Sequence, residues 1–134
     1  MSREVAPPSG APAPVDVEAP DGSPVDVRVI ATDVCERYRE EFPDERERYG
    51  DAGHQWCIHD NQYLLHWAML DVIGTTSLNE QVSWLARVLD ARDFPLDRLQ
   101  RDLEIAADVV EESGRPWAAE VAGRLRSARE AVRA

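Results

Sequence analysis

Residues 56–73 read WCIHDNQYLLHWAMLDVI, and this stretch decides the fold. Apolar and aromatic side chains recur in it every three or four residues and cover most of the circumference of a helix. A helix that is apolar on nearly all sides is typical of a buried position with neighbours on several faces. Gly74 is the expected C-cap that ends this helix. The sequence therefore predicts a bundle packed around residues 56–73.

The preceding segment predicts one helix and the bent start of another. From about Val29, apolar side chains share one helical face, and Pro43 ends this first helix. The face consists of Ile30, Val34, Tyr38 and Phe42. Asp44 is a candidate N-cap for the next segment, in which Gly50 and Gly53 each lower helix stability by about 1 kcal/mol. We expect this segment to form a weak or bent helix start.

Three further helices are predicted after Gly74. Ser77 and Glu80 form a capping box that marks the start of the first. Pro95 lies near the first turn of the second, Gly114 ends it, and the third begins at about residue 116. The apolar stripes are, in chain order, Leu78, Val82, Leu85 and Leu89, then Leu96, Leu99, Leu103, Ala106 and Val110, then Trp117, Val121, Leu125, Ala128 and Val132.

These segments predict an all-α fold, a small antiparallel helical bundle of four to five helices in residues 25–134. Residues 1–24 are rich in Pro, Ala and Gly, and we expect them to form a disordered N-terminal tail. Residues 15–17 and 25–27 both read VDV around a Pro-Asp-Gly turn signal, which is the pattern of a β-hairpin. Prolines on both sides weaken the hairpin signal. Disorder is therefore the preferred interpretation, and the hairpin is the alternative.

The composition excludes several classes of function. The 134 residues include 26 acidic and 15 basic side chains, and the net charge of -11 repels phosphate backbones and anionic membranes. All 15 basic residues are Arg, which excludes Schiff-base chemistry and a P-loop lysine and is the bias of a GC-rich bacterial genome. Neither a membrane span nor a signal peptide is apparent. We expect an acidic, cytoplasmic, bacterial protein that binds no nucleic acid and no membrane.

Polar and titratable side chains interrupt the central helix and make it the candidate site. Buried polar groups need partners, so these side chains either form hydrogen bonds within the core or bind a ligand. Aromatic rings at these spacings line one side of a helix and can hold a planar ligand, for example a haem bound through one of the histidines. The candidate ligand-binding residues are Trp56, His59, Asp60, Tyr63, His66 and Trp67.

Metal and thiol chemistry have little support in the sequence. His59 and His66 are seven residues apart, which places them about 10 Å apart along the helix, too far to chelate one metal. No Glu-x-x-His or His-Glu-x-x-His pattern is present, and Cys35 and Cys57 form no C-x-x-C pair. We therefore expect no catalytic residue, no metal ligand and no cofactor, with haem or a metal as the alternative.

The leading functional hypothesis is a non-enzymatic bacterial helical-bundle module that acts either by binding a partner protein or as a regulatory domain. It rests on the acidic composition, the expected flexible tail and the lack of an assembled catalytic motif. The alternative is a bundle that senses a small ligand or cofactor through the Trp- and His-rich central helix. A third hypothesis is a small helical enzyme that uses His59 and Asp60 as an acid–base pair.

Overall fold

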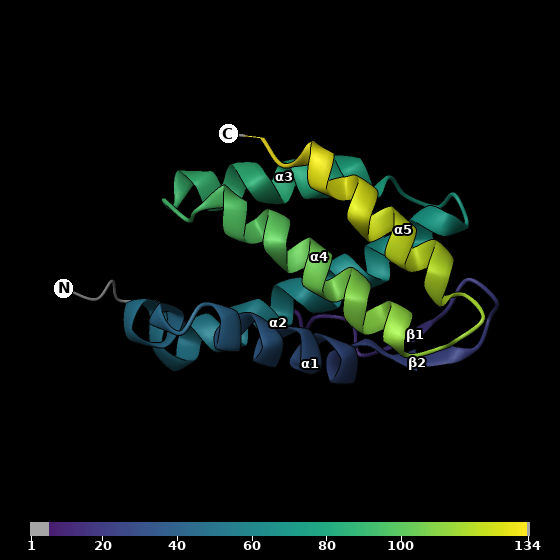
Figure 1. The fold of residues 1–134 in the computed structure, drawn as a ribbon, viewed down its shortest axis with the longest axis horizontal. Coiled ribbons are helices and arrows are strands. Elements are labelled where there is room, and N and C mark those ends of the chain that lie inside the picture. The colour runs from purple at the N-terminus through teal and green to yellow at the C-terminus, as the bar shows by residue number, and fades with distance from the viewer. Residues whose placement is uncertain (1–5, 134) are drawn as a thin grey trace.

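Five α-helices and a two-stranded hairpin make up residues 6–133, the part of the chain that the computed structural model describes (Figure 1). The α-helices are α1 (Val27–Glu41), α2 (Asp44–Val72), α3 (Leu78–Ala91), α4 (Leu96–Glu112) and α5 (Ala118–Ala128), and a short 3-10 helix, η1 (Arg129–Ala131), follows them. α1 packs mainly on α2, and α4 packs on both α5 and α1. The predicted all-α bundle is confirmed.

The hairpin joins β1 (Asp16–Glu18) to β2 (Pro24–Asp26) in antiparallel register, with Val17 opposite Val25. Val25 is buried, and Val17 packs against the helical core. The expectation of disorder is wrong for this stretch, because the alternating valines bury apolar surface. Pro24 stands at the first position of its strand, where a missing N–H is tolerated. Residues 1–5 of the expected tail lie outside the described residues.

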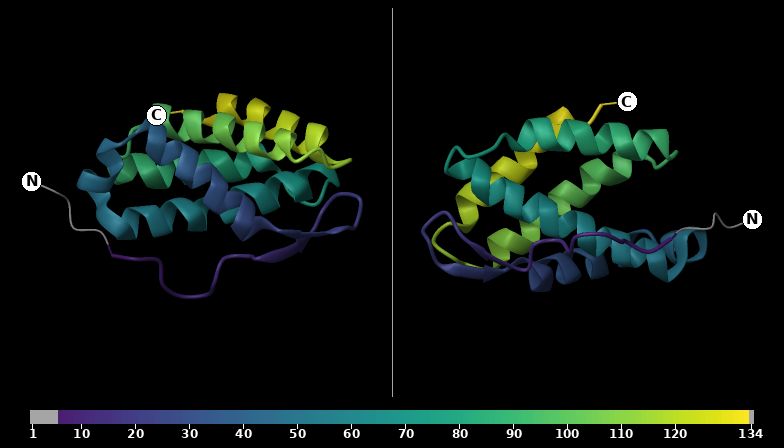
Figure 2. Two further views of the ribbon diagram at one scale, coloured as in Figure 1. Left: turned by 60° about the horizontal axis from the view of Figure 1, so that its bottom comes forward. Right: turned by 180° about the vertical axis from the view of Figure 1, so that it is seen from behind.

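Residues 6–14 have no regular secondary structure and run alongside α2 (Figure 2). Two α2 side chains hold them there. The indole N–H of Trp56 donates to the Ala6 carbonyl at 2.6 Å, and the Gln62 amide donates to the Pro14 carbonyl at 2.8 Å. This segment is therefore attached to the helix that the sequence singled out.

Most helix boundaries follow the local signals in the sequence. The Ser77 hydroxyl accepts a hydrogen bond from the Glu80 N–H at 3.2 Å, as the capping box predicts. Gly74 and Gly114 follow the ends of α2 and α4 with positive φ. The expected Asp44 cap is wrong, since Asp44 is the first residue of α2 and residue 43 holds the cap position. A proline fits there because its fixed φ already has the helical value.

The core is formed by apolar side chains from every helix, with Leu64, Leu65 and Leu103 among those that are fully buried. All five residues of the stripe predicted for the last helix are buried. In the described part of the chain, three polar or charged residues are also buried, namely Asn61, Gln62 and Asp102. A polar group in such a place needs a hydrogen-bond partner, and two of these three lie next to a cavity.

Asp26 is expected to stabilise the start of α1. Its carboxylate accepts hydrogen bonds from the backbone N–H groups of Arg28 at 2.9 Å and Val29 at 3.1 Å. Replacing Asp26 with Ala should lower the free energy of unfolding by about 1 kcal/mol, measured by urea denaturation. Asp33→Ala, at an exposed position inside the same helix, is the control and should cost less. Equal losses in the two variants would contradict the capping role.

Candidate functional site

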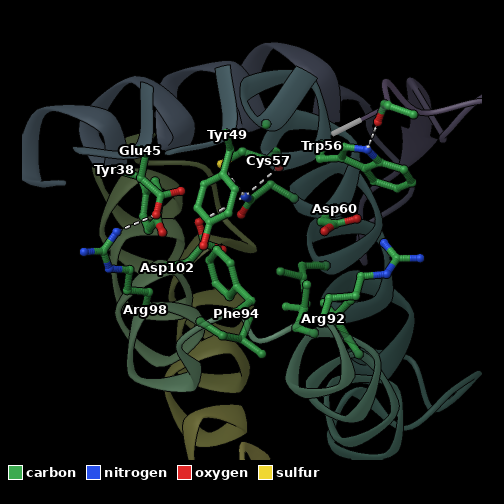
Figure 3. Close-up of a pocket in the computed structure, with 17 residues that line it drawn as sticks. Tyr38, Glu45, Tyr49, Trp56, Cys57, Asp60, Arg92, Phe94, Arg98 and Asp102 are labelled. Atoms are coloured by element: carbon green, nitrogen blue, oxygen red, sulfur yellow. Dashed lines mark hydrogen bonds and ion pairs between the residues drawn. The ribbon is translucent and has the colours of Figure 1, made fainter. Parts of the chain in front are cut away.

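A cavity of about 470 Å³ lies between α1, α2, α3 and α4 (Figure 3). This volume is within the range of small-molecule sites in proteins. Most of its surface is apolar, and α2 contributes the largest share of the lining. The lining residues are Ala6, Tyr38, Glu45, Tyr49, Gly53, Trp56, Cys57, Asp60, Asn61, Leu64, Leu85, Leu89, Arg92, Phe94, Arg98, Leu99 and Asp102.

The bend in α2 shapes one side of the cavity. Gly50 has φ 65° and ψ -161°, a conformation that side chains rarely adopt, and the helix changes direction there. Gly53 faces Tyr49 so closely that a Cβ at residue 53 would lie 2.4 Å from the Tyr49 Cβ. The Tyr49 ring in turn faces the Phe94 ring, with centroids 5.9 Å apart. The predicted bent helix start is therefore confirmed, and it places an aromatic ring in the cavity wall.

The floor of the cavity, formed by Tyr38, Asn61 and Asp102, is buried and polar. Asn61 is 2% exposed, and its amide nitrogen donates to Asp102 Oδ1 at 3.0 Å and to the Cys57 carbonyl at 2.9 Å. The Asn61 Oδ1 atom has no hydrogen-bond partner among residues 6–133. The hydroxyl of Tyr38 is buried too, and its interaction with the Glu45 carboxylate acts to lower the pKa of that group. The floor thus carries hydrogen-bonding capacity that the described residues leave unused.

Asp102 is a carboxyl group in an apolar setting. Asp102 is only 6% exposed, and burial raises the pKa of its carboxyl group to about 7. The hydrogen bond from Asn61 opposes the rise in pKa, and the negative charge of Asp60 adds to it. Asp102 takes part in none of the ion pairs found within the described chain. Near neutral pH it therefore exists in both the neutral and the ionised form.

Two thiols lie beside the floor. The Asn61 amide nitrogen is 3.5 Å from Cys35 Sγ and 3.6 Å from Cys57 Sγ, and both cysteines are free. Burial raises the pKa of the Cys35 thiol, and contact with Cys35 together with burial raises the pKa of Cys57. Both thiols are therefore protonated at neutral pH, which makes them poor nucleophiles.

The rim of the cavity, formed by Glu45, Arg92 and Arg98, carries the charged groups. Arg98 donates to Glu45 at 2.5 Å and to the Asp44 carboxylate at 3.0 Å. Arg92 lies over the Trp56 ring, 5.7 Å from its centroid. Figure 3 shows the two arginines on opposite sides of the cavity, with the Tyr49 and Phe94 rings between them.

Two of the six candidate site residues, Trp56 and Asp60, line this cavity, and the other four are not among its lining residues. His59, Tyr63 and Trp67 instead form a ladder of rings with Trp56, whose successive centroids are 5.0, 5.2 and 5.5 Å apart. These rings are half-buried, and the more deeply buried face of α2 contains Asn61, Leu64, Leu65, Ala68 and Met69.

The structure also locates the histidines that the sequence offers for acid–base chemistry or metal binding. His59 Nδ1 lies 3.1 Å from Asp60 Oδ1, so the proposed acid–base pair is in contact. Burial lowers the pKa of His66, which favours its neutral form. Within residues 6–133, no group of three or more His, Cys, Asp and Glu side chains is arranged to hold a metal ion. None of the helices in that range is long and apolar enough to cross a membrane.

No protein-family model, curated protein or solved structure matches this chain. The function is therefore inferred from the cavity and the groups that line it. The two buried polar residues at the cavity floor are Asn61 and Asp102, and neither is an aromatic residue or a histidine. Asp102 had a signal in the sequence, because it lies between Leu99 and Ala106 on the apolar stripe of its helix. Asn61 lies within the central stretch but was not among the candidate residues.

Proposed function

We propose that this chain is a small helical module that binds a small molecule in the cavity between α1, α2, α3 and α4. One observation carries the proposal: an apolar cavity of about 470 Å³ ends in a buried carboxyl group and a buried amide oxygen without a partner. A core built only for stability would satisfy or omit such groups, because each unsatisfied one costs about 1–3 kcal/mol. Convergent polar atoms at the end of an apolar cavity are typical of ligand sites.

We propose further that ligand binding acts on the N-terminal segment and gives the module a regulatory role. Ala6 lines the cavity, and the Trp56 side chain that binds its carbonyl lines the cavity as well. A ligand that moves the Trp56 ring would therefore loosen or tighten the attachment of residues 6–14. A ligand in the cavity would thus change the position of residues 6–14 on the surface of α2.

The partner-protein and enzyme hypotheses stay predictions. Among residues 6–133 the exposed large apolar side chains are Val29, Ile73 and Trp84, which belong to three different parts of the fold. His59 and Asp60 are in contact, but only Asp60 lines the cavity. Neither hypothesis has a feature as specific as the cavity floor in its favour.

Filling the cavity tests the proposal. The probes are indole, phenol, benzyl alcohol and phenethylamine, observed by saturation-transfer NMR. Leu89→Trp adds volume to a half-buried lining position, so probe binding should weaken at least about tenfold relative to the wild type. Ala91→Trp, at an exposed position on the same helix, is the matched control and should bind like the wild type. The proposal fails if no probe binds the wild type, or if Leu89→Trp leaves binding unchanged.

A further inference from the structure

The negative charge at the cavity floor has no counter-ion within the described chain. The described residues supply Asp102 with a single hydrogen bond, from the neutral Asn61 amide at 3.0 Å, and with no ion pair. A buried carboxylate is normally paired with a cation or bound to a metal. The floor is therefore incomplete in charge as well as in hydrogen bonding.

The two arginines that line the cavity are engaged elsewhere. Arg98 forms hydrogen bonds with Glu45 and Asp44, and these two carboxylates occupy its guanidinium group. Arg92 lies over the Trp56 ring at the opposite side of the rim. No ion pair within residues 6–133 joins either arginine to Asp102. An anionic ligand would thus meet uncompensated negative charge at the floor.

The second unused group at the floor is an acceptor. Asn61 Oδ1 is buried from water, so a donor reaches it only where the side chains of the floor shift to admit the head group. An ammonium group carries three N–H donors and a positive charge, and it can serve this oxygen and the Asp102 carboxylate together. A hydroxyl has one donor and no charge. The pair of acceptors therefore favours a charged, donor-rich head group.

The walls suit the rest of such a ligand. Leu64, Leu85, Leu89 and Leu99 provide apolar surface, and the aromatic rings that line the cavity belong to Tyr38, Tyr49, Trp56 and Phe94. Ring faces attract organic cations and pack against apolar groups. The volume of about 470 Å³ accommodates an aromatic ring with a short alkyl chain.

We propose that the ligand is an organic ammonium ion, a protonated primary amine on an apolar body, whose head group binds Asp102 and Asn61 Oδ1 at the cavity floor. This inference rests on the proposed function. The body lies against the leucines of α2, α3 and α4, and the ion pair between Glu45 and Arg98 at the rim stays intact.

The pH response of binding follows from the floor. The groups around Asp102 that titrate or carry charge are Asp60, Glu45, Tyr49 and Cys57 on α2, Cys35 and Tyr38 on α1, Arg98 on α4 and Arg92 after α3. With a pKa of about 7, the Asp102 carboxyl passes from mostly neutral at pH 6 to mostly ionised at pH 8. A primary amine stays protonated over this range. Its affinity should therefore rise about tenfold from pH 6 to pH 8.

Three probes with one body test the proposal by isothermal titration calorimetry. They are phenethylamine, 2-phenylethanol and phenylacetate, which present a cation, a neutral hydroxyl and an anion. At pH 8 phenethylamine should bind at least about tenfold more tightly than 2-phenylethanol, and phenylacetate should bind most weakly. Asp102→Asn should abolish the preference for the amine while 2-phenylethanol still binds. Asp90→Asn, at an exposed position, should keep the preference.

The outcomes separate this inference from the proposed function. Equal affinities for the three probes, or tighter binding of phenylacetate, would overturn the proposal that the ligand is an ammonium ion. In that case the cavity would still be supported as a binding site if Leu89→Trp abolishes the binding of the probes. An amine preference that survives in Asp102→Asn, or that shows no rise between pH 6 and pH 8, would also overturn it. Failure of every probe in the cavity-filling experiment would remove both.

Discussion

Replacing Asp102 with Asn is expected to raise the free energy of unfolding. The gain over the wild type should be about 4 kcal/mol larger at pH 8 than at pH 4. Burial raises the pKa of this carboxyl from 3.8 to about 7 in the folded state. Between these two values the folded chain keeps the proton and the unfolded chain releases it. The stability of the wild type therefore falls as the pH rises through this window, and the contribution levels off above pH 7.

The Asn variant isolates this effect. An amide has nearly the same shape as the carboxyl group, and its oxygen can still accept the hydrogen bond from Asn61. It carries no charge at any pH, so the cost of ionising a buried group disappears. The difference between variant and wild type removes the contributions of all other titrating groups that the two share.

Urea denaturation at pH 4, 6 and 8 measures the difference. The free energy of unfolding of Asp102→Asn should exceed that of the wild type by a margin that increases as the pH rises. Asp90→Asn, which removes an exposed carboxylate, should leave the pH dependence of the wild type essentially intact. A difference that stays constant from pH 4 to pH 8 would show that Asp102 is not strained by ionisation, and a loss of stability at pH 8 would contradict the argument altogether.

The helices could be predicted because their limits depend on neighbours in sequence. Ser77 and Glu80 form their cap within one turn, and Gly74 ends α2 by its own backbone conformation. The hairpin could not be decided in the same way. Its valines alternate correctly, but what holds it is contact between Val17, Val25 and the helical core, which lies beyond the local sequence. Composition alone therefore favoured disorder for a stretch that is ordered.

The candidate site was predicted only in part, for a related reason. The central helix was identified correctly, and Trp56 and Asp60 line its cavity. However, a helix with apolar and polar groups on every side does not reveal which side faces the cavity. That depends on how α4 packs, since α4 brings Asp102 to Asn61 from 41 positions away in the chain. The aromatic and histidine residues that the pattern favours as ligand contacts lie mostly on the half-buried side of the same helix.

The rim ion pair offers the second large effect, because Glu45 is only 13% exposed and its partner Arg98 16% exposed. Burial raises the pKa of Glu45, although the hydrogen bond from Arg98 opposes the rise. Removing the arginine leaves the carboxylate desolvated without its cation. Breaking a buried pair on one side is far more costly than losing the attraction between two exposed charges.

Arg98→Met is accordingly expected to lower the free energy of unfolding at pH 7 by about 3 kcal/mol, measured by urea denaturation. Methionine keeps much of the apolar stem but loses the contact of the guanidinium with the Phe42 ring, whose centroid lies 4.6 Å from Arg98 Cζ, so the loss reports on both the ion pair and this contact. Adding Glu45→Gln to Arg98→Met should restore most of the stability, because the uncompensated charge is then gone.

The chain contains a matched control for this pair. Arg126 also contacts two carboxylates, Glu111 at 2.6 Å and Asp108 at 2.9 Å, but all three side chains are exposed to solvent. Arg126→Met should therefore change the stability by less than about 1 kcal/mol. Similar losses for Arg98→Met and Arg126→Met would mean that burial contributes nothing at the rim. A loss in Arg98→Met that Glu45→Gln fails to restore would assign the effect to packing, and the cavity rim would then be held by shape rather than by its ion pair.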